Sequence, residues 1–488
     1  MLKGKLVELL KSFSNRERKR FGEYLDSPFF HAGDKHRKLF ATLDELMFYL
    51  GNQEVSKEQV WERLFPGSPF DDIEFRTCCS QLLKKAEDFL VQVALSNDDV
   101  EHKHLLASEL DRRRLDKHLN YTLITARKTV DKSPLRNASH YFDRFRIEVA
   151  QHQLNARSAF RSQKLAPQQA LEALDTYYFA NKLRYSCEIL NLRKILQIDP
   201  EIAMLPELEQ YLLSLEESDR DMGAVIRIYR NILSMLQEGD EEAYKSLRRL
   251  IEIHGSEFAT SELYELYIHA INFCIRRYNR GDTAYRAEIL GLYRGALDNG
   301  ALFDNNGFLS PSSYKNIVTI GLRAEEYKWV RRFIGDYKRK IPASFRENAY
   351  TYNLAKYYYA LGKFDNVLEL LREVEYEDVF YNLDSKTMLL KIYYDREESD
   401  ALFSLFDSFS VYLRRSKVLS PYHKTINLNL IRFVKKLAGI PEGETAKLDR
   451  LQKRIETNRE VADINWLLEK IEEKKSLSTR GRNRRVRS

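Results

Sequence analysis

The apolar residues follow a helical spacing along nearly the whole chain, and this constrains the fold more than any other feature. Leu2, Leu6, Leu9 and Phe13 recur on one face of a helix, and no comparable stretch alternates apolar and polar residues. Only 19 glycines and 11 prolines occur among 488 residues, about half of ordinary usage. Because sheet architectures need dense turns, these features exclude them and predict an all-α fold.

Capping signals divide the first part of the chain into separate helices. Ser14 with Glu17, and Ser56 with Gln59, have the spacing of a capping box, in which two side chains satisfy backbone groups at a helix start. Pro66-Gly67 interrupts the pattern, because proline cannot donate the helical hydrogen bond. Several short helices are therefore expected before residue 98.

Between about residues 101 and 192 the helical segments lengthen and carry few breakers. The candidate buried positions here share large apolar or aromatic side chains; they are Leu171, Leu174, Tyr178, Leu183 and Tyr185. This part of the chain is predicted to be a region of long connecting helices, 98–205.

Three degenerate copies of a helix-pair pattern follow in the second half. The first has Tyr314, Ile317, Val318 and Gly321 on one helix, Val330 and Ile334 on the next, and Pro342 after it. The second has Leu354, Ala355, Tyr358, Gly362, Phe364, Val367 and Leu371. The third has Leu389, Leu390, Tyr393, Leu402 and Phe406, with a charged turn at 396–398 where glycine is usual. These copies resemble tetratricopeptide repeats, whose period is about 34 residues.

Two upstream segments fit the same plan, 225–253 around Gly239 and 262–297 around Gly281. The phrases at 310–322 and 345–355 resemble a group of bacterial helical-repeat proteins with no assigned activity, and the resemblance covers about 171–437. It implies a fold rather than a reaction: a tetratricopeptide-like α-solenoid of antiparallel helix pairs, with repeats over 206–473.

Residues 1–97 differ from the repeats and are predicted to form an N-terminal helical cap. Within them, 56–95 is similar to the helix-turn-helix of bacterial activators that carry repeats after a winged helix, with Arg76, Lys84 and Lys85 on the second helix. No strand pair for a wing follows. Lys and Arg number 15 in this region and Asp and Glu also number 15, whereas a DNA-binding module should be basic. A cap that closes the end of a solenoid is the favoured interpretation.

The last residues, 474–488, carry seven Lys and Arg and no acidic residue, which equals the whole net charge of +7. The rest of the chain is therefore neutral. Because this tail has almost nothing apolar to bury, it is predicted to be disordered, with at most salt-sensitive attraction to phosphates.

Motifs of known chemistry are missing from the sequence. It has no glycine-rich phosphate loop, no Gly-x-Ser-x-Gly and no His-Glu-x-x-His, and His102 and His104 are spaced to point to different sides of a helix. We expect no enzyme activity, no cofactor and no metal. Four scattered cysteines, a charged amino-terminal stretch and the lack of a long apolar run predict a cytoplasmic protein without a membrane span.

The remaining function class is binding. In tetratricopeptide proteins the inner positions of the first helix of each pair line a concave groove, and carrying this register over places Lys and Tyr side chains there. The candidate partner-binding residues are Lys315, Tyr352, Lys356, Tyr359, Lys391 and Tyr394. Tyr supplies contact area at low entropy cost and Lys supplies charge, so an extended or helical peptide with acidic groups is the expected partner. The alternative is a nucleic-acid-binding regulator that uses Arg76, Lys84, Lys85 and the tail.

Overall fold

The chain folds almost entirely into helices. The computed structural model describes residues 4–30, 33–49, 55–157, 166–196, 201–217, 223–372, 379–441, 443–458 and 460–485. Within these ranges no β-strand occurs, and one isolated antiparallel bridge joins Phe303 and Leu309. The predicted all-α class is confirmed. The chain divides into two compact units, Met1–Ala259 and Thr260–Ser488, and this boundary lies inside the segment 206–473 that was predicted to hold the repeats.

The first unit consists of short helices followed by longer ones. Its helices are α1 (Lys5–Ser12), α2 (Asn15–Asp26), α3 (Gly33–Asp44), the π-helical turn Glu45–Tyr49, α4 (Lys57–Leu64), α5 (Asp72–Asn97), α6 (Asp99–Arg112), α7 (Asp116–Lys132), α8 (Ala138–Arg157), α9 (Ala166–Leu196), α10 (Leu205–Glu217), α11 (Gly223–Gln237), α12 (Glu241–His254) and the 3-10 turn Gly255–Glu257.

Helices α1 to α5 enclose one aromatic-rich core. Phe21 and Leu82 are fully buried in it, and the Phe21 and Phe89 rings lie 5.3 Å apart between centroids. Both predicted capping boxes are present: the Ser14 side chain accepts from the Glu17 amide, and the Ser56 side chain accepts from that of Gln59. Helix α5 packs on α1, α2 and α3. Helix α5 is long because its sequence contains no proline or glycine, and its apolar residues complete the core.

Helices α6 to α9 pack on one another in sequence, and α11 packs on both α9 and α12. The expected core of α9 was wrong in part. Leu183 is buried, but Leu171, Tyr178 and Tyr185 are exposed. The buried stripe of α9 consists instead of small residues with one leucine, namely Ala170, Ala173, Ala180, Leu183 and Cys187. Small side chains allow neighbouring helices to approach closely, so they form the packed face of this long helix.

The second unit is a succession of helices joined by short connections. Its helices are α13 (Thr260–Asn279), α14 (Tyr285–Asp298), α15 (Pro311–Arg323), α16 (Tyr327–Asp336), the 3-10 turn Lys338–Lys340, α17 (Arg346–Ala360), α18 (Phe364–Arg372), α19 (Val379–Asp395), α20 (Ser399–Arg415), α21 (Pro421–Ala438), α22 (Thr445–Thr457) and α23 (Ile464–Arg485).

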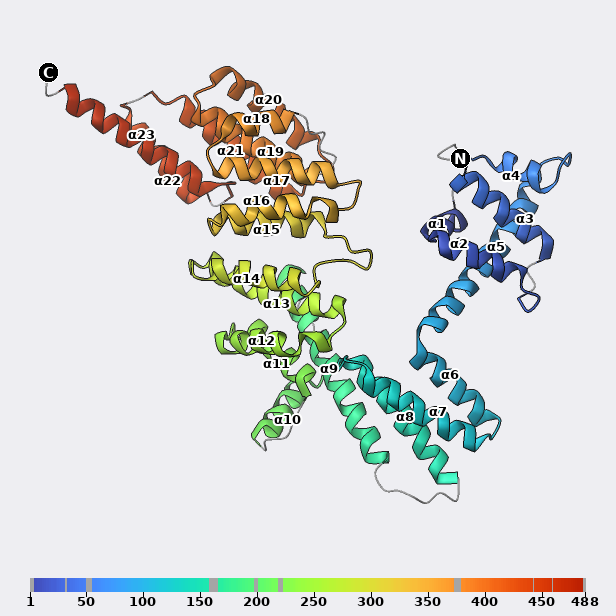
Figure 1. Ribbon diagram of the computed structural model, residues 1–488. Coiled ribbons are helices and arrows are strands. Elements are labelled where there is room, and N and C mark those ends of the chain that lie inside the picture. The colour runs from blue at the N-terminus through green and yellow to red at the C-terminus, as the bar shows by residue number, and fades with distance from the viewer. Residues whose placement is uncertain are drawn as a thin grey trace. The chain divides into compact units, whose positions relative to one another are not determined.

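Each helix of this unit contacts the next one in sequence, and α15, α17 and α19 also contact one another in order. Figure 1 shows α13 to α20 lying in successive layers. The predicted helices of all three copies are present, as α15 with α16, α17 with α18, and α19 with α20. Gly321 explains one close contact: a β-carbon placed there would lie 2.5 Å from Cγ2 of Val330 on α16.

The turns inside these three pairs have the same geometry. Glu325, Gly362 and Glu397 adopt left-handed backbone angles, with φ of 61°, 69° and 56°. In each turn the amide of the following residue donates to a carbonyl five residues back, at 3.0, 3.0 and 2.9 Å. This is the Schellman motif, which satisfies carbonyls at a helix end. The three turns are therefore more alike in geometry than in sequence, because glutamate occupies the left-handed position in two of them.

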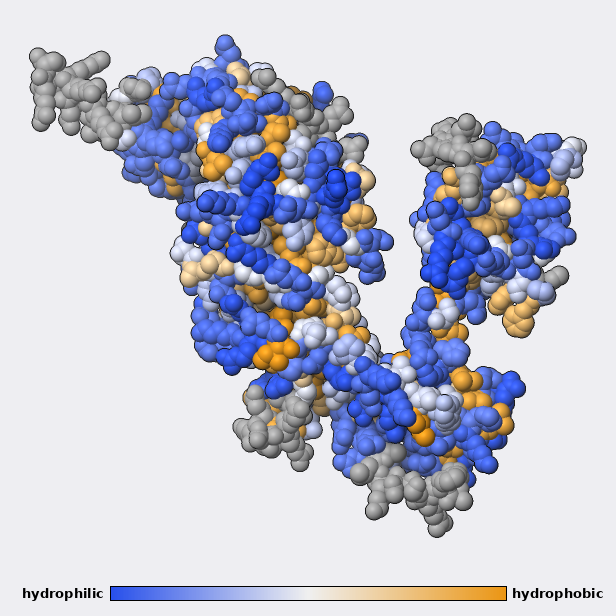
Figure 2. Space-filling view, viewed as in Figure 1, coloured by the Kyte–Doolittle hydropathy of each residue, from blue (hydrophilic) through white to orange (hydrophobic). Residues whose placement is uncertain are grey.

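The expected disorder after residue 473 differs from the structure. Helix α23 continues to Arg485, and its Lys475 pairs with Asp449 on α22 at 2.8 Å. Lys and Arg are good helix formers, so the segment extends a helix that Leu467 and Ile471 already anchor in the core. The surface of the second unit seen in Figure 2 is mainly hydrophilic, and apolar residues show between the helices.

Candidate functional site

The six candidate residues lie on three alternate helices of the second unit, α15, α17 and α19. We call them the Lys/Tyr row: Lys315, Tyr352, Lys356, Tyr359, Lys391 and Tyr394. On α17, Tyr352, Lys356 and Tyr359 share one face because they are separated by four and three positions. Helix α15 supplies Lys315, and α19 supplies Lys391 and Tyr394. Contacts between α15 and α17 and between α17 and α19 bring the row together.

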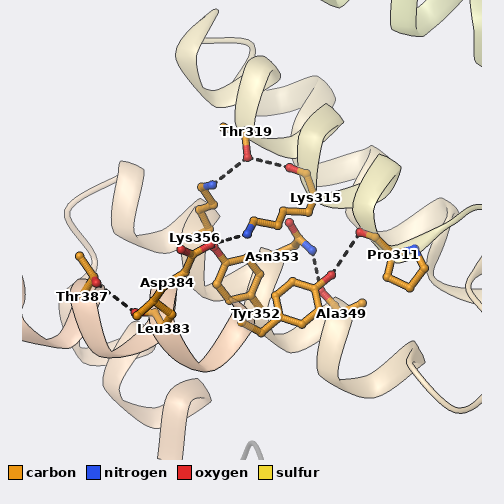
Figure 3. A network of polar contacts seen from close by, with 11 residues as sticks. Pro311, Lys315, Thr319, Ala349, Tyr352, Asn353, Lys356, Leu383, Asp384 and Thr387 are labelled. Atoms are coloured by element: carbon orange, nitrogen blue, oxygen red, sulfur yellow. Dashed lines mark hydrogen bonds and ion pairs between the residues drawn. The ribbon is translucent and has the colours of Figure 1, made fainter. Parts of the chain in front are cut away.

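Asp384 on α19 is the centre of the first half of the row (Figure 3). Its carboxylate forms an ion pair with Lys315 and accepts a hydrogen bond from the Tyr352 hydroxyl at 3.1 Å. The Lys315 ammonium also lies 5.6 Å from the ring centroids of Tyr352 and Tyr381. The Tyr381 hydroxyl donates to the Pro311 carbonyl at 3.1 Å. These contacts tie α19 to α15 across α17.

The charge of Lys356 is less well compensated than that of Lys315. The Lys356 ammonium donates to Oγ1 of Thr319 at 2.7 Å and lies 5.9 Å from the Tyr352 ring centroid. Burial lowers the pKa of Lys356 to about 8, and the positive charges of Lys315 and Arg323 act in the same direction, against the opposing effect of Asp384 and Asp463. A desolvated lysine without its own carboxylate is a feature of binding and catalytic sites more than of plain surfaces.

The second half of the row contacts the beginning of α23. The Lys391 ammonium pairs with Asp463 at 2.8 Å and lies 5.5 Å from the Trp466 ring centroid. The Tyr394 ring meets the Trp466 ring edge-on, with 5.5 Å between centroids. Asp463 has a left-handed backbone, φ 49°. An acidic and an aromatic side chain from elsewhere in the chain thus occupy this part of the row.

Tyr359 lies between the two halves. Its ring centroid is 5.8 Å from that of Phe364. Burial raises the pKa of the Tyr359 hydroxyl, and the negative charges of Asp395 and Asp463 add to this effect. Burial likewise raises the pKa of Tyr394 to about 12. Both hydroxyls are therefore neutral donors at physiological pH rather than nucleophiles or bases.

Sequence reasoning missed the acidic half of the site. Asp384 had a detectable signal, because it lies seven positions before Lys391 and shares its helix face. Asp463 and Trp466 had none, because they reach α19 through a contact more than 70 residues distant in sequence.

The basic residues proposed for nucleic acid are mostly engaged elsewhere. Arg76 pairs with Asp72 on its own helix at 2.6 Å, and the Lys85 ammonium donates to the Phe30 carbonyl at 2.9 Å. Lys84 is exposed on α5. Two of the three basic residues proposed for nucleic acid in segment 56–95, Arg76 and Lys85, thus have partners within the chain.

No group of three His, Cys, Asp or Glu side chains placed to hold a metal ion is found in the described ranges. Among the helices described, none has both the length and the apolar character needed to cross a bilayer. The chain matches no profile of a known protein family, and no curated protein matches it.

Proposed function

We propose that this chain is a non-catalytic protein- or peptide-binding scaffold. In this proposal it is a tetratricopeptide-like α-solenoid closed by an N-terminal helical cap, and the Lys/Tyr row is its partner-binding surface. The order of helix contacts and the three equivalent turns of the second unit support the repeat architecture. A cytoplasmic location belongs to the same proposal, and the four free cysteine thiols are compatible with it.

One observation carries the binding proposal: the row already accommodates an acid and an indole from another segment of the chain. Asp463 and Trp466 contact Lys391 and Tyr394 in the way a bound peptide would present a carboxylate next to an aromatic ring. The adjacent part of the row has the same residue types but a different balance of charge. The two carboxylates that act on Lys356 both pair with another lysine, Asp384 with Lys315 and Asp463 with Lys391. The exposed Arg323 adds a further positive charge near Lys356.

The surplus of positive charge defines the partner's chemistry. An acidic side chain placed near Lys356 and Arg323 would compensate a lysine whose charged form is disfavoured by burial. Tyrosine rings beside it supply rigid contact area for the peptide's apolar groups. We therefore expect a partner segment in which an Asp or Glu lies close to an aromatic residue.

Selection from a random peptide display library tests this, with the full chain as bait. We expect enrichment of acidic-aromatic sequences and loss of that enrichment with Lys356→Met, which removes the charge and keeps most of the stem. Lys328→Met is the matched control, because Lys328 is an exposed lysine on α16 outside the row. Enrichment equal to that of an unrelated helical protein, or enrichment that Lys356→Met leaves intact, contradicts the proposal.

The alternative proposal is a nucleic-acid-binding regulator that uses Arg76, Lys84, Lys85 and residues 474–488. Filter binding over a salt series separates the two, because contacts with phosphates weaken steeply as salt rises. Sequence preference that is lost with Lys84→Gln favours the alternative. Binding that disappears only when 474–488 are deleted indicates nonspecific attraction by the basic end.

A further inference from the structure

A groove of about 600 Å³ lies between α11 and α12 of the first unit, outside the three repeat copies. Arg227 and Arg230 on α11 and Arg249 on α12 line it, together with Ile253. The two helices form an antiparallel pair joined at Gly239, so residues early in α11 lie opposite residues late in α12. Arg227 and Arg249 therefore lie opposite each other on the half of the groove away from the turn, and Arg230 lies at the middle of α11.

The acidic residues of the groove lie at its other end and have partners there. Asp240 caps α12 by accepting from the Glu242 amide at 2.9 Å, and it also accepts from the Ser234 hydroxyl at 3.1 Å. The Glu242 carboxylate pairs with Lys245 at 2.8 Å. Charge is therefore separated along the groove. The acidic Asp240 and Glu242 lie near the turn, and Arg227 and Arg249 lie on the half away from it.

Arg227 and Arg249 are the groups left without compensation. Both are exposed, and neither has a carboxylate within ion-pair distance in the part of the chain that the structure describes. The neighbouring Arg248 differs, because it pairs with Glu252 on α12 at 3.3 Å. The Ile253 side chain, 62% exposed, adds apolar surface to the same end of the groove.

We infer that this end of the groove binds a phosphomonoester, with the dianion between Arg227 and Arg249 and the esterified group against Ile253. Guanidinium groups bind phosphate oxygens through paired hydrogen bonds, and several arginines converging on one point are typical of phosphoryl recognition. A long polyanion fits poorly, because Asp240 and Glu242 line the continuation of the groove. The inference does not rest on the Lys/Tyr row.

Isothermal titration calorimetry on the full chain tests the site with three probes: a short phosphoserine peptide, AMP and inorganic phosphate. Binding of the peptide alone identifies a protein-borne phosphate, and binding of AMP alone identifies a small-molecule source. In either case we expect Arg227→Gln and Arg249→Gln each to weaken binding about tenfold, the usual effect of losing one charge-assisted hydrogen-bonding group. Circular dichroism checks that each variant stays folded.

Arg248→Gln is the matched control, because it removes the same charge from the adjacent position outside the groove. We expect it to leave the affinity within about twofold, the size of a general electrostatic effect on an exposed site. Equal weakening by Arg248→Gln and Arg249→Gln overturns the site, as does the absence of binding by any probe at millimolar concentration. Tighter binding of oligo(dT) than of any phosphomonoester, with a steep salt dependence, overturns it in favour of nucleic acid.

Discussion

Helices α6 to α8 and helices α15 to α19 both contain partly buried charges, but they treat them differently. In α6–α8 two acids that face neighbouring helices, Glu148 and Glu101, each pair with an arginine of another helix. Glu148, 2% exposed, pairs with Arg127 at 2.8 Å, and Glu101 pairs with Arg146 at 2.6 Å. The hydrogen bond from Arg146 lowers the pKa of Glu101. A carboxylate that already has a cation in this way needs no further ligand.

In α15–α19 the balance is different, because the carboxylates that act on Lys356 each pair with another lysine, Asp384 with Lys315 and Asp463 with Lys391. Matched pairs mark places where helices pack on each other. A surplus of cations beside aromatic rings marks a place that gains from an added anion. The comparison therefore assigns packing to the first cluster, and it supports the binding role that we propose for the second.

The largest expected effect comes from breaking a matched pair. Arg127→Met leaves the Glu148 carboxylate buried without its cation, and we expect the free energy of unfolding to fall by about 3 kcal/mol. Urea denaturation, with hydrogen exchange over α7 and α8 to locate the change, measures it. Arg112→Met is the control, because Arg112 and Glu109 form an exposed pair worth less than about 1 kcal/mol. Equal effects of the two substitutions would contradict the assignment of Arg127 to helix packing.

The second effect concerns the close contact between α15 and α16 at Gly321. Gly321→Ala places a β-carbon 2.5 Å from Val330, and we expect a loss of about 1–3 kcal/mol in thermal or urea unfolding, as in other overpacked cores. Gly291→Ala on α14 is the matched control, since no atom lies within 4 Å of its added carbon. Alanine is the better helix former there, so a gain of about 0.5–1 kcal/mol is expected. A loss with Gly291→Ala as well would show that helix propensity does not decide these sites.

The third effect is a pH dependence of the free energy of unfolding that the buried Lys356 produces. The pKa of Lys356 is about 8 when folded and about 10.4 when unfolded. Between these values the unfolded chain binds more protons, so stability rises with pH across this window. We expect Lys356→Met to be more stable than the wild type below pH 8, with the difference shrinking toward pH 10.

The urea midpoints of Lys356→Met and the wild type over this pH range measure the difference. For the control Lys328→Met, we expect a midpoint that changes with pH as that of the wild type does. A constant difference between Lys356→Met and the wild type would mean that Lys356 keeps an ordinary pKa.

The smallest expected effect lies in the turns. Glu397 is exposed and its backbone is in the left-handed region, so Glu397→Gly relieves backbone strain. Glycine also adds freedom to the unfolded chain, and we expect a net gain of about 0.5 kcal/mol in the free energy of unfolding. Gly362→Ala should lose about 1 kcal/mol at the equivalent position. Differential scanning calorimetry of both variants checks the opposite signs, and shifts of the same sign would mean that the two turns are not equivalent.

Much of the fold could be predicted because helix pairs follow from local patterns. The spacing from Tyr314 to Gly321 and the proline after it place α15 and its neighbours without any long-range information. The register of the Lys/Tyr row had the same origin, since four- and three-residue steps set the face of α17. Its role in binding remains a proposal.

The rest depends on contacts that a local pattern does not contain. The apolar stripe of α9 suggested a buried face through Tyr178 and Tyr185, yet the alanine stripe is buried, because neighbouring helices select the side that allows close approach. The occupant of the row's second half, Asp463 with Trp466, comes from the loop before α23 and the first turn of that helix. Local composition also suggested disorder after residue 473, where helix α23 continues.

The equivalent turns have a consequence for how such a chain can change in length. Each turn is closed by hydrogen bonds that stay within its own pair, at Gly321, Tyr358 and Tyr393 carbonyls. Duplication or loss of one pair would leave the closures of its neighbours untouched. A lineage of these proteins could thus lengthen or shorten this unit in steps of one pair, without redesigning what remains.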